Sequence, residues 1–174
     1  TDIGVEVASM GVQIHGGMGF IEETGAAQHY RDARIAPIYE GTNGIQAIDL
    51  IGRKVPMENG GVMDALCADM SASVEHLMAT PGLGGVGSRL EAGIAALERA
   101  TDWILRNKGP RALSAATPYL KLAGDVVGGW MLARQALAVA GADDAWSLSK
   151  AALARVYASQ VLALAPGLAD GLTE

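Results

Sequence analysis

The chain has 174 residues, of which half are apolar and 18% are charged, so it can bury a substantial core. Its formal net charge of −6, without a cluster of lysine and arginine, argues against a nucleic-acid surface. The single cysteine, Cys67, excludes a disulfide framework and a cysteine-based zinc site, and we expect it to be an inert apolar residue. No apolar run reaches the roughly 18 residues that span a bilayer, so we expect no membrane span.

Three helices are expected in the first part of the chain, over residues 2–14, 24–35 and 42–54. Their apolar residues recur at spacings of three and four. The paired glycines Gly16 and Gly17 end the first helix, and Thr24 and Thr42 are the expected N-caps of the other two. Because the chain opens within a helical pattern, without an initiator methionine or a leader sequence, we expect a fragment of a longer protein without a signal peptide.

A glycine-rich break over residues 56–61 interrupts the helical pattern. It predicts a linker between one domain at 1–55 and a second at 62–174. Within the second domain, apolar periodicity predicts four further helices, over residues 62–79, 89–107, 117–141 and 145–164. The short loops between them predict an up-and-down four-helix bundle, and no segment alternates with period two. The predicted fold class is therefore all-α.

Residues with capping chemistry set the expected starts of the bundle helices. Ser88 and Glu91 form a capping-box pattern, and Thr117 followed by a proline has the pattern of an N-cap with proline at the first helical position. Asp143 or Asp144 is the expected cap of the last helix. Pro166 and the glycine after it are expected to end that helix, with a frayed tail over 168–174.

Glu40 is the residue with the clearest chemical interest. It follows an apolar run and precedes a glycine and a helix-capping threonine. Burial would raise the pKa of a carboxyl group towards neutrality, which suits a base that removes a proton. The alternative interpretation is a solvated loop acid beside an N-cap, and local pattern alone leaves both open.

Three motifs in order resemble the C-terminal region of acyl-CoA dehydrogenases. They are the glycine run QIHGGMGF, the helix end RDARI and the segment IYEGT, which contains Glu40. The resemblance covers residues 1–54 closely and implies the end of that family's catalytic helical domain. Residues after Val55 resemble the extra helical C-terminal domain of the bacterial subgroup that includes 3-methylthiopropanoyl-CoA dehydrogenase. The resemblance thus implies an FAD-dependent enzyme that introduces an α,β double bond into an acyl-CoA thioester.

The resemblance also implies roles for individual residues. Glu40 matches the catalytic base that removes the proton alpha to the thioester, after which a hydride passes from the beta carbon to flavin N5. Gly41 matches a position that lies against the substrate, although it also simply turns the chain into the next helix. Thr42, Asn43 and Gly44 match FAD contacts at the start of that helix, where many relatives have glutamine in place of Gly44.

The glycine run matches the segment that binds the adenine end of FAD, usually the FAD of a neighbouring subunit. The implied contacts are Gln13, Ile14, His15, Gly16 and Gly17. Alone, such a run is equally consistent with the end of a helix and a turn, and no strand precedes it as in a Rossmann fold. No metal site is expected, because the three histidines lack ligand spacing.

The family further implies a homo-oligomer, an electron-transferring flavoprotein as electron acceptor and a bacterial cytoplasmic location. We expect the isolated fragment to be inactive, because upstream domains hold most of the flavin and substrate. Two other interpretations remain open. Residues 62–174 could serve assembly rather than chemistry, since their apolar stripes lack a polar constellation, or the protein could be a non-catalytic relative.

Overall fold

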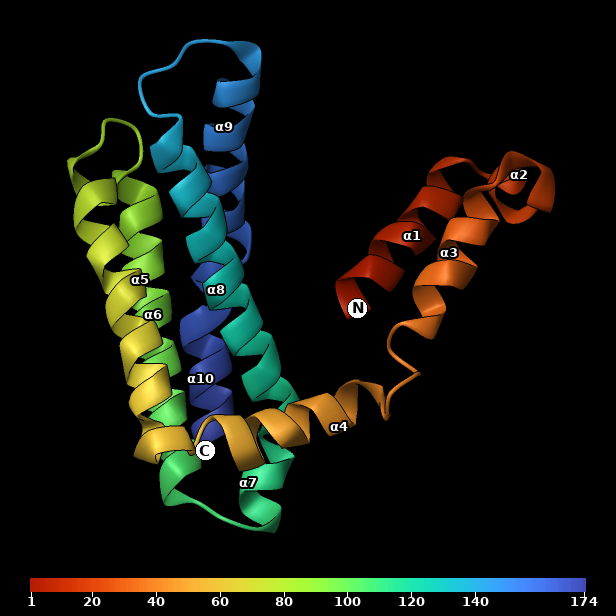
Figure 1. The fold of residues 1–174 in the computed structure, drawn as a ribbon. Coiled ribbons are helices and arrows are strands. Elements are labelled where there is room, and N and C mark those ends of the chain that lie inside the picture. Colours follow the sequence, from red (N-terminus) through yellow and green to blue (C-terminus); the bar gives the residue numbers. More distant parts are fainter. The chain divides into compact units, whose positions relative to one another are not determined.

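The computed structural model describes residues 1–174, which fold into helices joined by short turns, without any strand (Figure 1). The prediction of an all-α fold is confirmed. By internal contacts the chain divides into two compact units, Thr1–Gln46 and Ala47–Glu174. The domain boundary at residues 56–61 stays a prediction, and in the structure Ala47, Ile51 and Val55 are buried in the core of the second unit.

The first unit is a small assembly of helices around α1 (Asp2–Ile14). The chain turns through the short α2 (Gly17–Phe20) and returns along α3 (Ala26–Ile35), which packs against α1. A tight turn then leads into α4 (Thr42–Asp49). The apolar residues of α1 face outward: Ile3, Val7, Met10 and Ile14 are all more than half exposed.

The start of α3 differs from the prediction. Thr24 does not cap this helix, because its hydroxyl donates to the carbonyl oxygen of Met18 at 2.6 Å. Residues Glu22–Thr24 form one turn of 3-10 helix, and Gly25, in the left-handed region at φ 80°, leads into α3. The threonine therefore closes the preceding turn instead.

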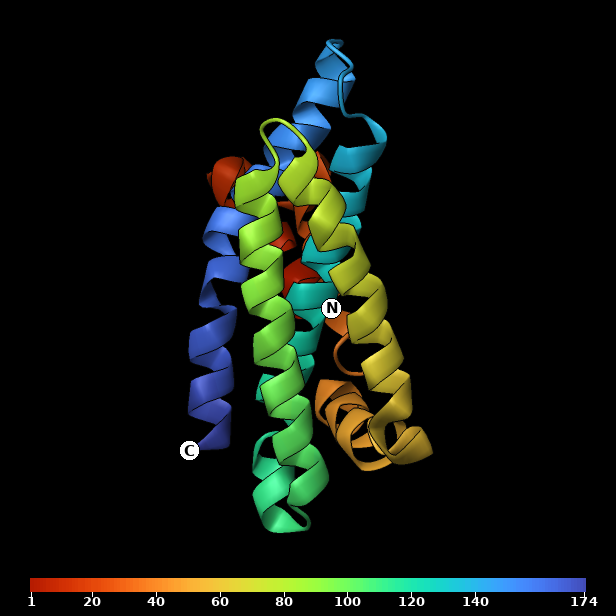
Figure 2. The same ribbon diagram turned by 90° about the vertical axis from the view of Figure 1, so that its left-hand side faces the viewer.

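The second unit contains the up-and-down bundle that the sequence predicts. Helix α4 continues as a π-helical turn (Leu50–Lys54), and a 3-10 turn (Met57–Gly60) leads into the bundle. Successive bundle helices run in opposite directions (Figures 1 and 2). They are α5 (Gly61–Ala79), α6 (Gly84–Arg106), α8 (Ala116–Ala138) and α9 (Ala145–Gln160), with the short α7 (Pro110–Ser114) between α6 and α8.

Two of the predicted starts in the bundle are too late. Helix α6 begins at Gly84 instead of residue 89, and the Ser88 hydroxyl donates to the Gly84 carbonyl from inside the helix. Helix α8 begins at Ala116, so Thr117 lies within its first turn and is not its N-cap. Asp144 is the cap of α9, as predicted, and its carboxylate accepts hydrogen bonds from two main-chain N–H groups.

The end of the chain is folded, and the prediction of a frayed tail is wrong. After a break at Val161 and one 3-10 turn (Leu162–Leu164), α10 (Ala165–Thr173) continues down the bundle. Pro166 lies at the start of α10, where a proline needs no hydrogen-bonded N–H. Ala169 and Leu172 are buried, so α10 completes the fourth side of the bundle against α6 and α8.

By length and composition, the stretch Ala145–Thr173 could cross a membrane. The helix is interrupted after Gln160, however, and small side chains on one side of it pack into the bundle, among them Ala154, Ala158 and Ala165. A core helix satisfies the same criteria of length and composition. The stretch therefore does not indicate a membrane span.

The bundle core contains a buried hydrogen bond between two side-chain hydroxyl groups. The hydroxyl groups of Tyr119 and Thr101 lie 2.7 Å apart, and the Tyr119 side chain is fully buried. Burial raises the pKa of Tyr119 to about 12. Burial likewise raises the pKa of the Cys67 thiol to about 11, which fits the expected inert residue because the reactive form is the thiolate.

We expect the bundle to lose stability at alkaline pH through Tyr119. Below pH 10 both the folded and the unfolded chain keep the phenol protonated, so this contribution is fully present. Between pH 10 and 12 the unfolded chain ionises first, so stability falls with rising pH, by on the order of 2 kcal/mol. Urea unfolding at pH 8 and pH 11, followed by tryptophan fluorescence, measures this difference. Because the buried Cys67 thiol, whose pKa is also raised, adds a loss over the same range, the comparison is made in a Cys67→Ala background. There Tyr119→Phe should lose less stability than the chain that keeps Tyr119, whereas an equal alkaline loss would contradict the assignment.

Candidate functional site

The turn between α3 and α4 has an unusual backbone. Glu40, Gly41 and Thr42 follow one another with φ values of 56°, 88° and 72°. Glycine adopts such values freely, but a non-glycine residue there costs about 1–3 kcal/mol, and a β-branched threonine is a marked outlier. Strain of this kind persists only where the surrounding structure maintains it, and it is concentrated at functional sites.

Hydrogen bonds on both sides maintain this turn. The side-chain amide of Gln46, one turn into α4, donates to the Glu40 carbonyl oxygen at 3.3 Å. The side-chain amide of Asn43 donates to the Asp2 carboxylate at 2.7 Å and accepts from the Thr1 hydroxyl at 2.8 Å. The turn is thereby joined to the start of α1.

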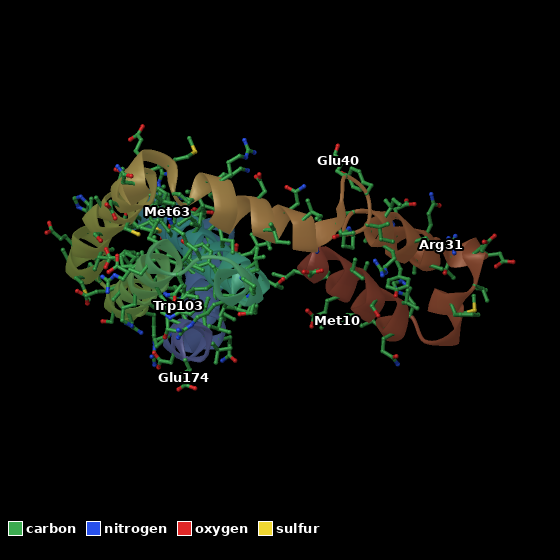
Figure 3. All side chains as sticks on the ribbon, turned by 90° about the horizontal axis from the view of Figure 1, so that it is seen from below. Met10, Arg31, Glu40, Met63, Trp103 and Glu174 are labelled. Carbon is green, nitrogen blue, oxygen red and sulfur yellow. The ribbon has the colours of Figure 1, made fainter.

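The Glu40 carboxylate projects from the turn into solvent (Figure 3). The apolar residues before it do not cover it, because Ile38 and Tyr39 are themselves about half exposed. The residues of this chain therefore supply the position of the carboxylate but not the apolar surroundings that the sequence suggested.

An open groove of about 550 Å³ lies beside the turn. Its lining includes Thr42 and Gly44, at the N-terminus of α4, together with Arg34, Ile38 and Asp2. N–H groups in the first turn of a helix lack intrahelical partners and attract anions, and Gly44 has no side chain to block an approach. Arg34, Thr42 and Gly44 suit a phosphate-bearing cofactor, and the Asp2 carboxylate in the same lining is hydrogen-bonded to the Asn43 amide. Asn43 stays a predicted contact, but its side-chain amide is bonded to α1.

The predicted adenine-binding segment lies at the other end of α1. Gly16 has φ 61° and ψ −145°, a conformation open essentially only to glycine, and it turns the chain from α1 into α2. The ring of His15 is hydrogen-bonded through Nδ1 to the Gly11 carbonyl oxygen at 2.8 Å. Because α1 is 13 residues long, this segment and the start of α4 are about 20 Å apart along the helix. The structure does not bring the two predicted cofactor-binding sets together.

Gly19 is a residue of this region that sequence reasoning did not single out. A Cβ atom there would lie 2.8 Å from Cβ of His15 and closer still to the Val12 carbonyl oxygen. Gly17, in the same short helix, has open space around it. The close packing of α2 on α1 thus requires a glycine at one position of α2 but not at the other.

We expect Gly19→Ala to destabilise the first unit by about 1–3 kcal/mol, because the backbone of α1 has to move away. Gly17→Ala is the matched control and should have little effect. Hydrogen–deuterium exchange of peptides from residues 1–46 measures both, and it should show faster exchange in Gly19→Ala alone. Equal exchange in the two variants would show that this contact does not hold α2 in place.

Comparison with known families accounts for both units. The family described as "Acyl-CoA dehydrogenase, C-terminal domain" matches residues 1–55, and the one described as "Acetyl-CoA dehydrogenase C-terminal like" matches residues 63–174, more than half of the chain. The chain belongs to the acyl-CoA dehydrogenase family. This confirms the resemblance that the three N-terminal motifs indicated.

Individual relatives support the same membership. A 3-methylmercaptopropionyl-CoA dehydrogenase of Ruegeria pomeroyi is 46% identical over 172 residues, 93% of this chain and 29% of the relative. A butyryl-CoA dehydrogenase of Syntrophomonas wolfei is 31% identical over 81% of this chain and 23% of the relative. The human mitochondrial short-chain specific acyl-CoA dehydrogenase is 50% identical over 46 residues, 26% of this chain and 11% of the relative. The chain therefore spans less than a third of the length of these relatives.

Proposed function

We propose that the protein containing this chain is an FAD-dependent acyl-CoA dehydrogenase in which Glu40 is the catalytic base. The observation that carries this proposal is the strained turn, which holds the Glu40 carboxylate outward at the N-terminus of α4. Residues are kept in such conformations where their position matters more than local stability. Family membership supports the same reaction class.

In the proposed reaction the Glu40 carboxylate takes the proton from the carbon alpha to the thioester. The beta carbon loses its hydrogen as a hydride, and the pair of electrons left by the α C–H bond forms the new double bond. Bound FAD would supply the acceptor for that hydride, at flavin N5. A base that acts on so weak an acid needs close alignment with it, and the turn supplies that alignment. Gly41 matches the family position that lies against the thioester, and in this turn its φ of 88° also favours glycine, since a Cβ there would lie 3.3 Å from Cγ2 of Ile45.

Two regions of the chain would contact FAD. Thr42 and Gly44 offer a hydroxyl and main-chain N–H groups at the start of α4, and Asn43 lies between them. Gln13 to Gly17 offer backbone groups at the far end of α1. In the family the second region usually contacts the FAD of a neighbouring subunit, so the proposal includes a homo-oligomer.

Further parts of the proposal follow from the family alone. The substrate would be an acyl-CoA and the electron acceptor an electron-transferring flavoprotein. The proposed location, the bacterial cytoplasm, rests on the resemblance to the bacterial subgroup, since the family also has mitochondrial members. The chain alone would be inactive, because it leaves Glu40 uncovered. Mixing the flavin-loaded enzyme anaerobically with a panel of acyl-CoAs tests the reaction class. Bleaching of the flavin by at least one of them is expected, and an unchanged flavin spectrum with every acyl-CoA would count against the proposal.

A second candidate function, assembly, concerns the bundle alone. One side of α9 and the turn after it exposes large apolar residues, among them Trp146, Leu153, Val156 and Leu164. Charged residues are few there, since Lys150 and Arg155 are the only ones between positions 145 and 169. Such a surface suits contact between copies of the full-length enzyme. Sedimentation of the enzyme with and without residues 56–174 tests this, and an unchanged oligomer after deletion would exclude it.

A further inference from the structure

Gln46 lies outside the hydrophobic core but makes a specific hydrogen bond to the main chain. Its side chain is exposed on the surface of α4, yet its amide points back to the main-chain carbonyl oxygen of Glu40, 3.3 Å away. An exposed hydrogen bond of this kind contributes little to overall stability, because water replaces it readily. Its consequence is local: it fixes the peptide plane directly after Glu40.

That peptide plane controls where the Glu40 side chain points. With Glu40 at φ 56° and Thr42 at φ 72°, the turn lies in a sparsely populated conformation and would relax if released. Release of the Glu40 carbonyl frees rotation about ψ of Glu40, the Cα–C bond, and this rotation moves Cβ relative to the start of α4. The carboxylate would then move away from its place beside the helix N-terminus.

Asn43 anchors the other side of the same turn. Its amide bonds to Asp2 and Thr1 fix the first turn of α4 to the start of α1, independently of Gln46. The main-chain N–H of Asn43 also approaches the Pro37 carbonyl oxygen, at 3.4 Å. Glu40 therefore lies between two points that side-chain amides of α4 hold in place.

We propose that Gln46 is a positioning residue for Glu40, with Asn43 as the second anchor of the turn. This inference rests on the proposed function of Glu40 as the base. Gln46 acts through the Glu40 carbonyl and touches neither substrate nor cofactor. Because proton transfer requires hydrogen-bond distance, a displacement of about 1 Å can cost up to ~10²-fold in rate.

The test compares Gln46→Met, which keeps the length of the side chain and removes its donor, with wild type in the flavin-loaded full-length enzyme. Gln28→Met is the matched control, since Gln28 is an exposed glutamine on α3 of the same unit. Stopped-flow measurement of flavin bleaching by an acyl-CoA that reduces the wild-type enzyme gives the rate of reduction and the acyl-CoA Kd separately. We expect Gln46→Met to lower the rate about tenfold, with the Kd, the FAD content and the melting temperature unchanged.

Two results would overturn the inference. One is a rate for Gln46→Met within about twofold of the Gln28→Met control. The other is a slower rate accompanied by loss of FAD or a lower melting temperature, which would indicate a merely structural role. Glu40→Gln, measured in parallel, separates this inference from the proposed function. If Glu40→Gln still reduces flavin normally, both fail; if it is inactive while Gln46→Met is normal, only the positioning role fails.

Discussion

Replacing Glu40 with glutamine is expected to lower the rate of flavin reduction by acyl-CoA by about 10²–10⁴-fold. Glutamine cannot accept a proton near neutral pH, so it cannot act as the base. Because it has nearly the same shape as glutamate, substrate and cofactor should still bind. The measurement is stopped-flow bleaching of the flavin in the full-length enzyme, together with its FAD content. FAD content should be unchanged, because Glu40 projects outward and its side chain holds no part of the turn.

Glu23→Gln is the matched control for this experiment. Glu23 is an exposed acid in the same unit, on the 3-10 turn that precedes α3, and its loss removes the same charge without touching the Glu40 turn. Flavin reduction at the wild-type rate in Glu40→Gln would show that another residue is the base. An equal loss in both variants would show that net charge, and not proton transfer, explains the effect.

The sequence predicted the positions of helices well where buried residues recur with helical periodicity. It predicted helix ends less well where contacts with a neighbouring helix determine the end. The capping-box pattern at Ser88 and Glu91 is a local signal, but Val86 and Gly87 are buried where α6 meets α5, and a Cβ at Gly87 would lie 3.1 Å from Cβ of Leu77. This contact extends α6 backwards past the expected cap. Tertiary packing of this kind routinely overrides a local preference.

At the candidate site, motif order identified Glu40 but could not give its conformation. Nothing in the residue type of Thr42 indicates a left-handed backbone, because β-branched residues avoid it. The hydrogen bond from Gln46 to the Glu40 carbonyl oxygen depends on that conformation, so the sequence could not predict it either. Gly19 was overlooked for another reason: its importance lies in the close approach of α2 to α1, which the glycine run itself does not reveal.

Leu162, between α9 and α10, packs against the rest of the bundle, and we expect its replacement to cause a large loss of stability. Leu162 is fully buried, and a Cβ at Gly129 would lie 2.7 Å from both of its Cδ atoms. Leu162→Ala should cost about 2–5 kcal/mol in unfolding free energy, since it leaves a cavity. Gly129→Ala should cost about 1–3 kcal/mol, since buried Leu162 has little room to move.

The double variant should be less destabilised than the sum of the two single variants, because the added methyl group occupies part of the space that Leu162 vacates. We expect a coupling energy of about 1 kcal/mol or more from urea unfolding of the 174-residue chain. Tryptophan fluorescence reports on the bundle alone, because Trp103, Trp130 and Trp146 all lie in the second unit. Leu164→Ala, at an exposed leucine two residues further on, should change stability by no more than about 0.5 kcal/mol. Strictly additive losses would mean that Leu162 does not pack on Gly129, and α10 would then need another explanation for its place in the bundle.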